Sequence, residues 1–349
     1  MEGTTRVPGL VSPLDKDFFV MAKKVILHRE IDPMLAMMLD SLIFDLSRLY
    51  GYLPRETNAN HPTRLNEEDL RVLDDPHLGL ESVMTAISLE TELFMKPPCF
   101  LGHREPNLYL STQLAPLIEL VAVTISEALL GPPCSKHRKL AESLVAGDMV
   151  ISYNYDMLMD NALRNCGKLS DSGYLLPFEK VSSGGTWEKP DEKASEITLL
   201  KLHGSLNWTR CTNCDSNLMM RYEKMDHWET SIPKTCPKCG EDGIYLERLL
   251  VPPLLTKDYS DHAINYLWRE ASRRLHRNIH EIVAIGYSLP ATDFASETLL
   301  RTGLQFNRQK EISLTLVNPD KEVLDRFSKI FAPSKITWIK SIAEYLDVL

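Results

Sequence analysis

A histidine and two pairs of cysteines are the side chains of this sequence best suited to chemistry. His203 directly follows a short apolar run, residues 197–202, and precedes Gly204, so we expect its imidazole at the sharp turn that ends a buried strand. An imidazole titrates near neutral pH and is therefore a candidate proton acceptor in this position. The alternative is a histidine whose side chain only satisfies the turn.

The cysteines have the spacing of a metal site rather than of disulfides. Two Cys-x-x-Cys pairs flank residues 215–235, which is close to the spacing typical of a four-thiolate zinc site. The predicted ligands are Cys211, Cys214, Cys236 and Cys239. Such a site leaves no coordination position open for substrate or water, so we assign the zinc a structural role. Cys99, Cys134 and Cys166 follow no ligand pattern.

Other predicted strands also end in polar residues. These residues are Asn154 and Asp156, Gly286 and Ser288, and Asn318 and Asp320. Because the carboxyl ends of parallel strands share one edge of a sheet, we expect all of them, with His203, to line one rim. Each could instead serve an ordinary turn or helix cap. Four polar strand ends on one edge favour a nucleotide-type ligand.

The elements that must position these residues alternate between strand and helix. Strands are predicted over 149–153, 197–202, 281–287, 312–317 and 336–339. Helices are predicted over 136–144, 157–165, 266–279, 294–306 and 321–330. This alternation predicts an α/β fold with a Rossmann-like doubly wound parallel sheet.

The region 32–131 has a different pattern, with helices and no strand. Its predicted helices cover 34–50, 67–73, 78–95 and 109–130. We therefore expect a Rossmann-like domain of residues 1–31, 132–205 and 248–349, an inserted helical module of 32–131, and a small four-cysteine zinc module of 206–247. The helices are more apolar than a small lid requires, so part of their surface is expected to form a contact between subunits.

Composition places the chain among ordinary globular proteins of a reducing compartment. Its 349 residues allow two domains, and 39 Lys+Arg against 48 Asp+Glu give a net charge of −9, which does not favour nucleic acid or an anionic membrane. The most apolar stretch, 114–130, contains Glu119 and Glu127 and is short for a membrane span. The start lacks a secretory signal, and paired cysteines indicate metal, so we expect a cytoplasmic protein.

Taken together, these segments resemble the sirtuin (silent information regulator) family of NAD-consuming enzymes. HGSLNWTRCTNC followed by CPKC is similar to the family's catalytic-histidine and zinc segment. SYNYD is similar to its Thr-Gln-Asn-Ile-Asp segment, with Asn154 and Asp156 at matching positions. IGYSLPATD resembles its Gly-Thr-Ser nucleotide loop, through Gly286 and Ser288, and LVNPD resembles the strand that ends on the adenosine ribose, through Asn318.

The HGSLNW and NYD forms are most similar to a bacterial sirtuin-like branch associated with phage defence. This resemblance implies hydrolysis of NAD, a homo-oligomer, and an antiviral role with a partner ATPase or Argonaute-type protein. It implies that His203 is the general base, that Asn154 orients the ribose or the attacking water, and that Asp156 holds the carboxamide end and stabilises positive charge. Gly286, Ser288 and Asn318 would bind the cofactor.

The chain departs from the family pattern at its start. The family begins with a strand and a glycine-rich loop that cradles the diphosphate, whereas residues 9–18 resemble only the family segment just after that loop. This departure leaves open a non-catalytic sirtuin-like nucleotide sensor or assembly subunit. An NAD-dependent protein deacylase is a second, separate alternative. A deacylase would pair an extended peptide with an edge strand near Pro252 and Pro253, which remove two backbone donors.

Overall fold

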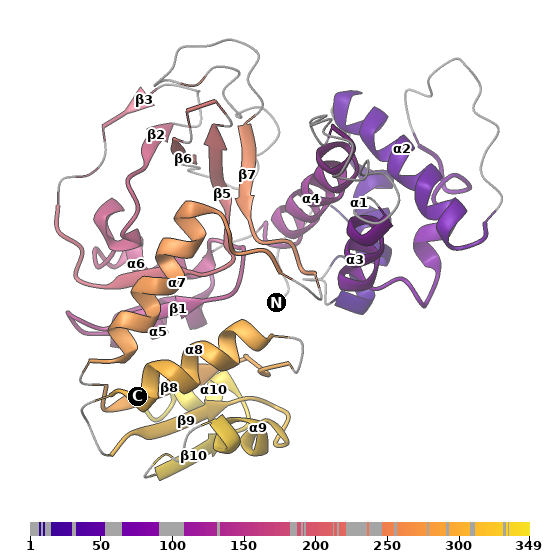
Figure 1. The fold of residues 1–349 in the computed structure, drawn as a ribbon. Helices are drawn as coiled ribbons and strands as arrows, with labels where there is room; N and C mark the ends of the chain where they lie inside the picture. The colour runs from indigo at the N-terminus through magenta and orange to yellow at the C-terminus, as the bar shows by residue number, and fades with distance from the viewer. Residues whose placement is uncertain are drawn as a thin grey trace, which may run out of the picture.

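The computed structural model describes most of the chain. The described residues are 7, 10, 15–29, 33–52, 65–90, 108–130, 133–181, 187–189, 191, 193–211, 213–214, 216–220, 236, 246–254, 257–277, 279–290, 293–307, 311–330, 333 and 335–349. Cys99 and Cys239 lie outside these ranges. Helices α1 to α4 form one body, and the strands with α5 to α10 form the other (Figure 1).

The helical body is all α among its described residues, as the sequence predicts. Its elements are α1 (Phe18–His28), α2 (Pro33–Leu49), α3 (Leu80–Glu90) and α4 (Leu108–Ala128), with the 3-10 turns η1 (Asp15–Asp17) and η2 (Arg71–Asp74). Apolar faces of all four helices meet in one core, which includes Phe19, Leu39, Val83 and Leu117. Of the helices that the structure describes, none is both long enough and apolar enough to cross a bilayer.

The helix predicted over 67–73 is shorter than expected. Only Arg71–Asp74 is helical, as a 3-10 turn, and the preceding residues form turns. The side chain of Asn66 accepts hydrogen bonds from the amides of Glu68 and Asp69, at 2.9 and 3.0 Å. At the other end Asp75 precedes a proline and is extended, because proline disfavours the helical conformation in the residue before it.

Parallel strands and covering helices make up the larger part of the other body. Strands β1 (Met149–Ser152) and β4 (Thr198–Lys201) pair with each other, and β8 (Glu281–Ile285), β9 (Ser313–Val317) and β10 (Lys335–Ile339) pair in the order β10-β9-β8. The helices are α5 (Ser135–Ser143), α6 (Leu158–Asn165), α7 (His262–Leu275), α8 (Phe294–Gln305), α9 (Val323–Ile330) and α10 (Ile342–Leu346). The predicted α/β class with parallel strands is confirmed. Within the described ranges these strands form two hydrogen-bonded sheets, and one apolar core spans both.

A third sheet of mixed direction was not predicted. Its order is β3-β2-β6-β5-β7, and its strands are β2 (Glu179–Val181), β3 (Trp187–Glu188), β5 (Gly204–Cys211), β6 (Asn217–Met220) and β7 (Leu246–Leu250). It lies at the upper end of the body in Figure 1, the β8–β10 sheet lies at the lower end, and β1 and α7 lie between them. Strand β5 starts directly after His203 and ends at the first metal-site cysteine, so it crosses the predicted domain boundary.

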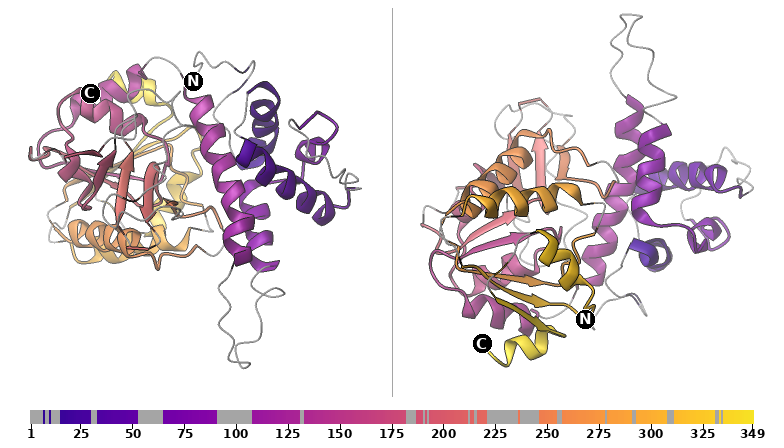
Figure 2. Two further views of the ribbon diagram at one scale, coloured as in Figure 1. Left: turned by 90° about the horizontal axis from the view of Figure 1, so that it is seen from above. Right: turned by 60° about the horizontal axis from the view of Figure 1, so that its bottom comes forward.

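Helix α4 connects the two bodies. It lies between the other helices of its module and the strands in both views of Figure 2. On strand β7, the guanidinium of Arg248 donates to both carboxylate oxygens of Glu119 on α4, at 2.6 and 2.7 Å. A further nitrogen of the same guanidinium donates to the carbonyl oxygen of Leu206 on β5, at 2.9 Å. A paired and largely buried charge therefore ties the helical module to the strands next to His203.

Candidate functional site

The last residue of β1 and the segment that follows it, residues 152–156, are hydrogen-bonded to the turn that follows β4. The amide of Leu202 donates to the carbonyl oxygen of Ser152 at 3.0 Å, and the amide of Leu206 donates to that of Tyr155 at 2.9 Å. In the register of the pair, the last residues of the two parallel strands lie opposite each other. The structure therefore brings the two predicted site segments together at one sheet edge.

The turn after His203 depends on glycine. Gly204 has a φ of +80°, a conformation that residues with a Cβ rarely adopt, and a Cβ built there would lie 1.9 Å from the carbonyl oxygen of Leu249. The carbonyl oxygen of His203 accepts the amide of Val251 at 3.0 Å, which holds the turn against the residue that follows β7. The backbone of the histidine is thus fixed on both sides.

The imidazole of His203 is packed among aromatic rings, and the residue as a whole is 7% exposed. Tyr153 meets it edge-on at 5.2 Å between ring centroids, and the ring of Trp268 lies at 6.2 Å. Burial lowers the pKa of His203 to about 4, against a partial increase caused by the Asp293 carboxylate and a further decrease caused by Lys257. The imidazole is therefore uncharged at neutral pH.

One ring nitrogen of His203 has the chemistry of an unused acceptor. A hydrogen bond with the backbone of Tyr153 also raises the pKa of the imidazole, by less than burial lowers it. Its Nε2 atom is buried and has no hydrogen-bond partner among the residues that the structure describes, so we assign the Tyr153 hydrogen bond, and the ring proton, to Nδ1. In this tautomer Nε2 carries a lone pair, which can accept a proton from water or from a sugar hydroxyl. A buried acceptor without a partner is costly unless a ligand supplies the missing donor.

Asn154 and Asp156 are placed differently from each other. Asn154 is exposed, and its backbone N–H donates to the Ser152 hydroxyl at 3.2 Å. One carboxylate oxygen of Asp156 accepts the amide of Leu158 at 2.9 Å, at the start of α6. Asp156 therefore performs the helix-start role that the sequence left open, and a role in binding remains a proposal for it.

The three predicted cofactor-binding residues gather at the carboxyl ends of β8 and β9. Gly286 and Ser288 are exposed, and Gly286 has a φ of +68°. Asn318 is buried, and its side-chain amide donates to the carbonyl oxygen of Tyr287 at 3.5 Å. The Tyr287 ring stacks on Tyr153 with centroids 4.5 Å apart, so this group and the His203 group share one rim.

Sequence reasoning missed two side chains near His203. Asp293 is 4% exposed, accepts the Tyr287 hydroxyl at 2.7 Å and caps α8. Trp268 of α7 donates through its indole nitrogen to the carbonyl oxygen of Leu202 at 2.9 Å. The only sequence signal for Asp293 was an aspartate directly before a helix, which by itself indicates no more than a cap.

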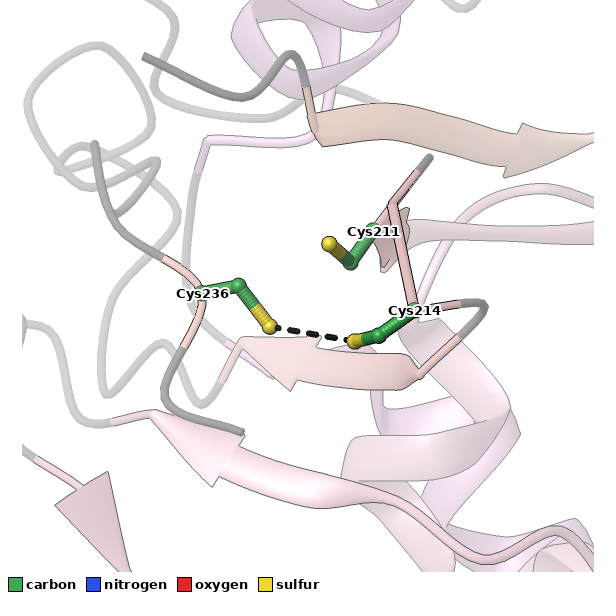
Figure 3. Close-up of side chains that lie close together, drawn as sticks. All are labelled: Cys211, Cys214 and Cys236. Carbon is green, nitrogen blue, oxygen red and sulfur yellow. Dashed lines mark hydrogen bonds between the residues drawn. The ribbon is translucent and has the colours of Figure 1, made fainter. Parts of the chain in front are cut away.

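Three of the four cysteines predicted as metal ligands lie together in the described part of the structure. The sulfurs of Cys211, Cys214 and Cys236 lie within 4.8 Å of one another, and those of Cys214 and Cys236 are 3.6 Å apart (Figure 3). A hydrogen bond with the Ser216 hydroxyl contributes most to lowering the pKa of Cys214 to about 6, which favours the thiolate that binds metal. The predicted fourth ligand, Cys239, lies outside the described residues. This donor set fits a structural zinc ion.

Comparisons with known proteins return sirtuins among solved structures. No protein-family model matches the chain. No curated protein matches it either. A structure solved for the basis of sirtuin substrate affinity is 17% identical, with 62% of this chain and 70% of that chain covered and a TM-score of 0.34. A structure of Sir2 bound to an acetylated peptide is 15% identical, with 62% of this chain and 68% of that chain covered and a TM-score of 0.34. A structure of Sir2 with a p53 peptide and NAD+ is 16% identical, with 76% of this chain and 88% of that chain covered and a TM-score of 0.35.

Proposed function

We propose that this chain is an NAD hydrolase that cleaves the bond between nicotinamide and ribose to release nicotinamide and ADP-ribose. The observation that carries the proposal is the state of His203, which is buried and uncharged with a lone pair on Nε2 that meets no donor among the described residues. It lies at a parallel strand end, hydrogen-bonded to the segment that holds Asn154. The resemblance of both segments to sirtuin segments supports NAD as the substrate.

The reaction needs charge stabilisation and an oriented nucleophile more than it needs an acid. The C1′–N bond breaks with its electron pair going to nicotinamide, which leaves as a neutral molecule, and a ribosyl cation develops. Water then forms the new C–O bond, and its proton passes to Nε2 of His203. A weak base suffices, because the cation captures any water that is correctly placed. In this proposal Asn154 orients that water or the ribose, and the negative charges of the Asp156 and Asp293 carboxylates stabilise the positive charge that develops on the ribose.

The other predicted residues complete the proposal. Gly286, Ser288 and Asn318 would hold the adenosine half of NAD, because they lie along the same rim as His203. The cysteine cluster would hold zinc in a structural role. Self-association and action as a defence effector with a partner ATPase or Argonaute-type protein belong to the same proposal, and the HGSLNW and NYD sequence forms support them.

The test is a product analysis of the purified chain incubated with NAD. We expect free nicotinamide and ADP-ribose, and we expect His203→Ala to lower turnover by about 2 to 4 powers of ten, the usual size of a lost acid–base group. His276→Ala is the matched control, because it removes a histidine that lies at the C-terminal end of α7 against Phe306 and belongs to none of the predicted site segments. Acyl-ADP-ribose formed only with an acylated peptide would indicate a deacylase instead. Binding of NAD without turnover would indicate a sensor.

A further inference from the structure

Lys201 carries a fully buried ammonium group two residues before His203. It is the only charged residue of strand β4, and its side chain is 0% exposed. The ammonium donates to a carboxylate oxygen of Asp160 at 3.1 Å and to the carbonyl oxygens of Asp156 and, at 3.5 Å, Tyr155. An ammonium group has three N–H donors, so these three acceptors account for all of them.

The acceptor carboxylate is itself held rigidly. The second oxygen of Asp160, on α6, accepts the hydroxyl of Tyr174 at 2.8 Å. Tyr174 is buried in the 3-10 turn η5 (Asp171–Tyr174), and its ring lies 5.4 Å from the guanidinium carbon of Arg164. The position of the ammonium is therefore determined by two elements besides its own strand.

The two carbonyl acceptors belong to the segment that carries Asn154. The carbonyl oxygen of Tyr155 also accepts the amide of Leu206 and, at 3.4 Å, the hydroxyl of Ser205. Lys201 thus joins the same hydrogen-bonded junction from the interior of the protein, and it does so with a charged donor, which bonds more strongly than a neutral one.

Packing alone does not explain a charge at this position. Taking an ammonium and a carboxylate out of water is costly, and an apolar pair of similar volume holds a strand to a helix at least as well. What an apolar side chain cannot do is fix the direction of two backbone carbonyl groups. The contacts of Lys201 therefore point to a role in setting the geometry of the loop.

We propose that Lys201 is a positioning residue that holds the 153–156 segment, and with it Asn154, against His203. The role of this geometry in turnover rests on the proposed function, whereas the effect on the loop does not. Because Lys201 is fully buried beneath the loop, we expect its loss to act on kcat more than on KM.

The test compares two buried lysine–aspartate pairs. Lys201→Met with Asp160→Asn removes both charges of the site pair and leaves an acceptor for Tyr174. The control is Lys180→Met alone, which breaks another buried lysine–aspartate pair, with charged atoms 2.7 Å apart, and leaves Asp171 of the η5 turn its ion pair with Arg164.

Hydrogen exchange without NAD, followed on peptides that cover 153–157, is the primary measurement. We expect exchange there to be about 10-fold faster in the Lys201 double variant and unchanged in the control. The proposal would be overturned if the exchange rate of these peptides were unchanged in the Lys201 double variant, or if it rose equally in that variant and in the control. Lys201→Gln keeps a neutral donor and should show a smaller increase in the same direction. No increase in that single variant would count against the proposal even if the double variant did not fold.

Kinetics with NAD form the second measurement. We expect kcat to fall about 10- to 100-fold in the Lys201 double variant with KM changed by less than about threefold, since a small misplacement of a reacting group has effects of this size. A fall of the same size in the control would reduce the role of Lys201 to stability. Absence of turnover in the wild-type protein would contradict the proposed function, while the exchange comparison would still decide the role of Lys201.

Discussion

Acidification should destabilise this protein in a way that depends on His203. Burial lowers the pKa of the folded imidazole to about 4, from its ordinary value of 6.5. Because the folded-state pKa is depressed, the unfolded chain binds more protons between these two values. The contribution of the uncharged imidazole is therefore fully present above pH 6.5 and is lost as the pH falls toward 4.

The size of the loss follows from linkage. A pKa difference of one unit corresponds to about 1.4 kcal/mol once the pH lies below both values. With pKa values of 6.5 unfolded and about 4 folded, the free energy of unfolding should fall by about 1.4 kcal/mol at pH 5.5 and by about 2.6 kcal/mol at pH 4.5, relative to alkaline pH. A loss of this size is a large fraction of the stability of an ordinary domain.

Urea denaturation of the wild-type protein and of His203→Asn, at pH 7.5, 6.5, 5.5 and 4.5, measures this loss. Asparagine is chosen because its side-chain N–H₂ can replace the Nδ1 donor to Tyr153 and does not titrate. Both proteins contain the same cysteine cluster, so metal release in acid cancels in the comparison. The wild-type stability should fall more steeply, by about 2.6 kcal/mol over the range. Parallel curves for the two proteins would refute the reasoning, and His276→Asn shows the effect of removing a histidine elsewhere.

Three further changes test the frame around the site. Gly204→Ala should lower the free energy of unfolding by about 2 to 4 kcal/mol in urea denaturation, because of its positive φ and the contact with the carbonyl oxygen of Leu249; a loss below about 1 kcal/mol would contradict the observed turn. Glu119→Gln should cost about 2 kcal/mol and speed proteolysis between the two bodies, because the buried guanidinium of Arg248 loses its countercharge; an unchanged digestion pattern would argue against this anchor. Cys211→Ser should abolish bound zinc, measured with a metal-sensitive dye, and stoichiometric zinc in this variant would exclude the cysteine as a ligand.

The strands of the parallel sheets could be predicted because their signal is local. The apolar run before His203 and the sequence EIVAI both lack helical periodicity and form strands close to their predicted bounds. Strand β5 shows why a similar signal failed. Leu206 and Trp208 alternate with polar neighbours, which is a strand pattern, but the cysteine spacing beyond them favoured a metal knuckle.

The environment of the site could not be predicted, because it depends on contacts between distant segments. Lys201 was visible only as a single charge in an apolar strand, and its acceptors lie more than forty positions away, with |i−j| values of 41 to 46. Asp293 has the sequence context of an ordinary helix cap. Its proximity to the buried histidine follows from Tyr287, which donates its hydroxyl to Asp293 and stacks on Tyr153, and no short motif specifies these contacts.

Strand β5 connects the two sites of this structure directly, because it begins next to His203 and ends at Cys211. The strand contains 8 residues, so it is about 25 Å long, and almost all of its residues are buried. The turn at His203 lies at one end of the strand and Cys211 at the other, and Arg248, which is paired with Glu119 of α4, donates to the carbonyl oxygen of Leu206 near the His203 end. We therefore expect a change at the cysteine cluster, or a displacement of α4, to reach the turn at His203 through this one strand.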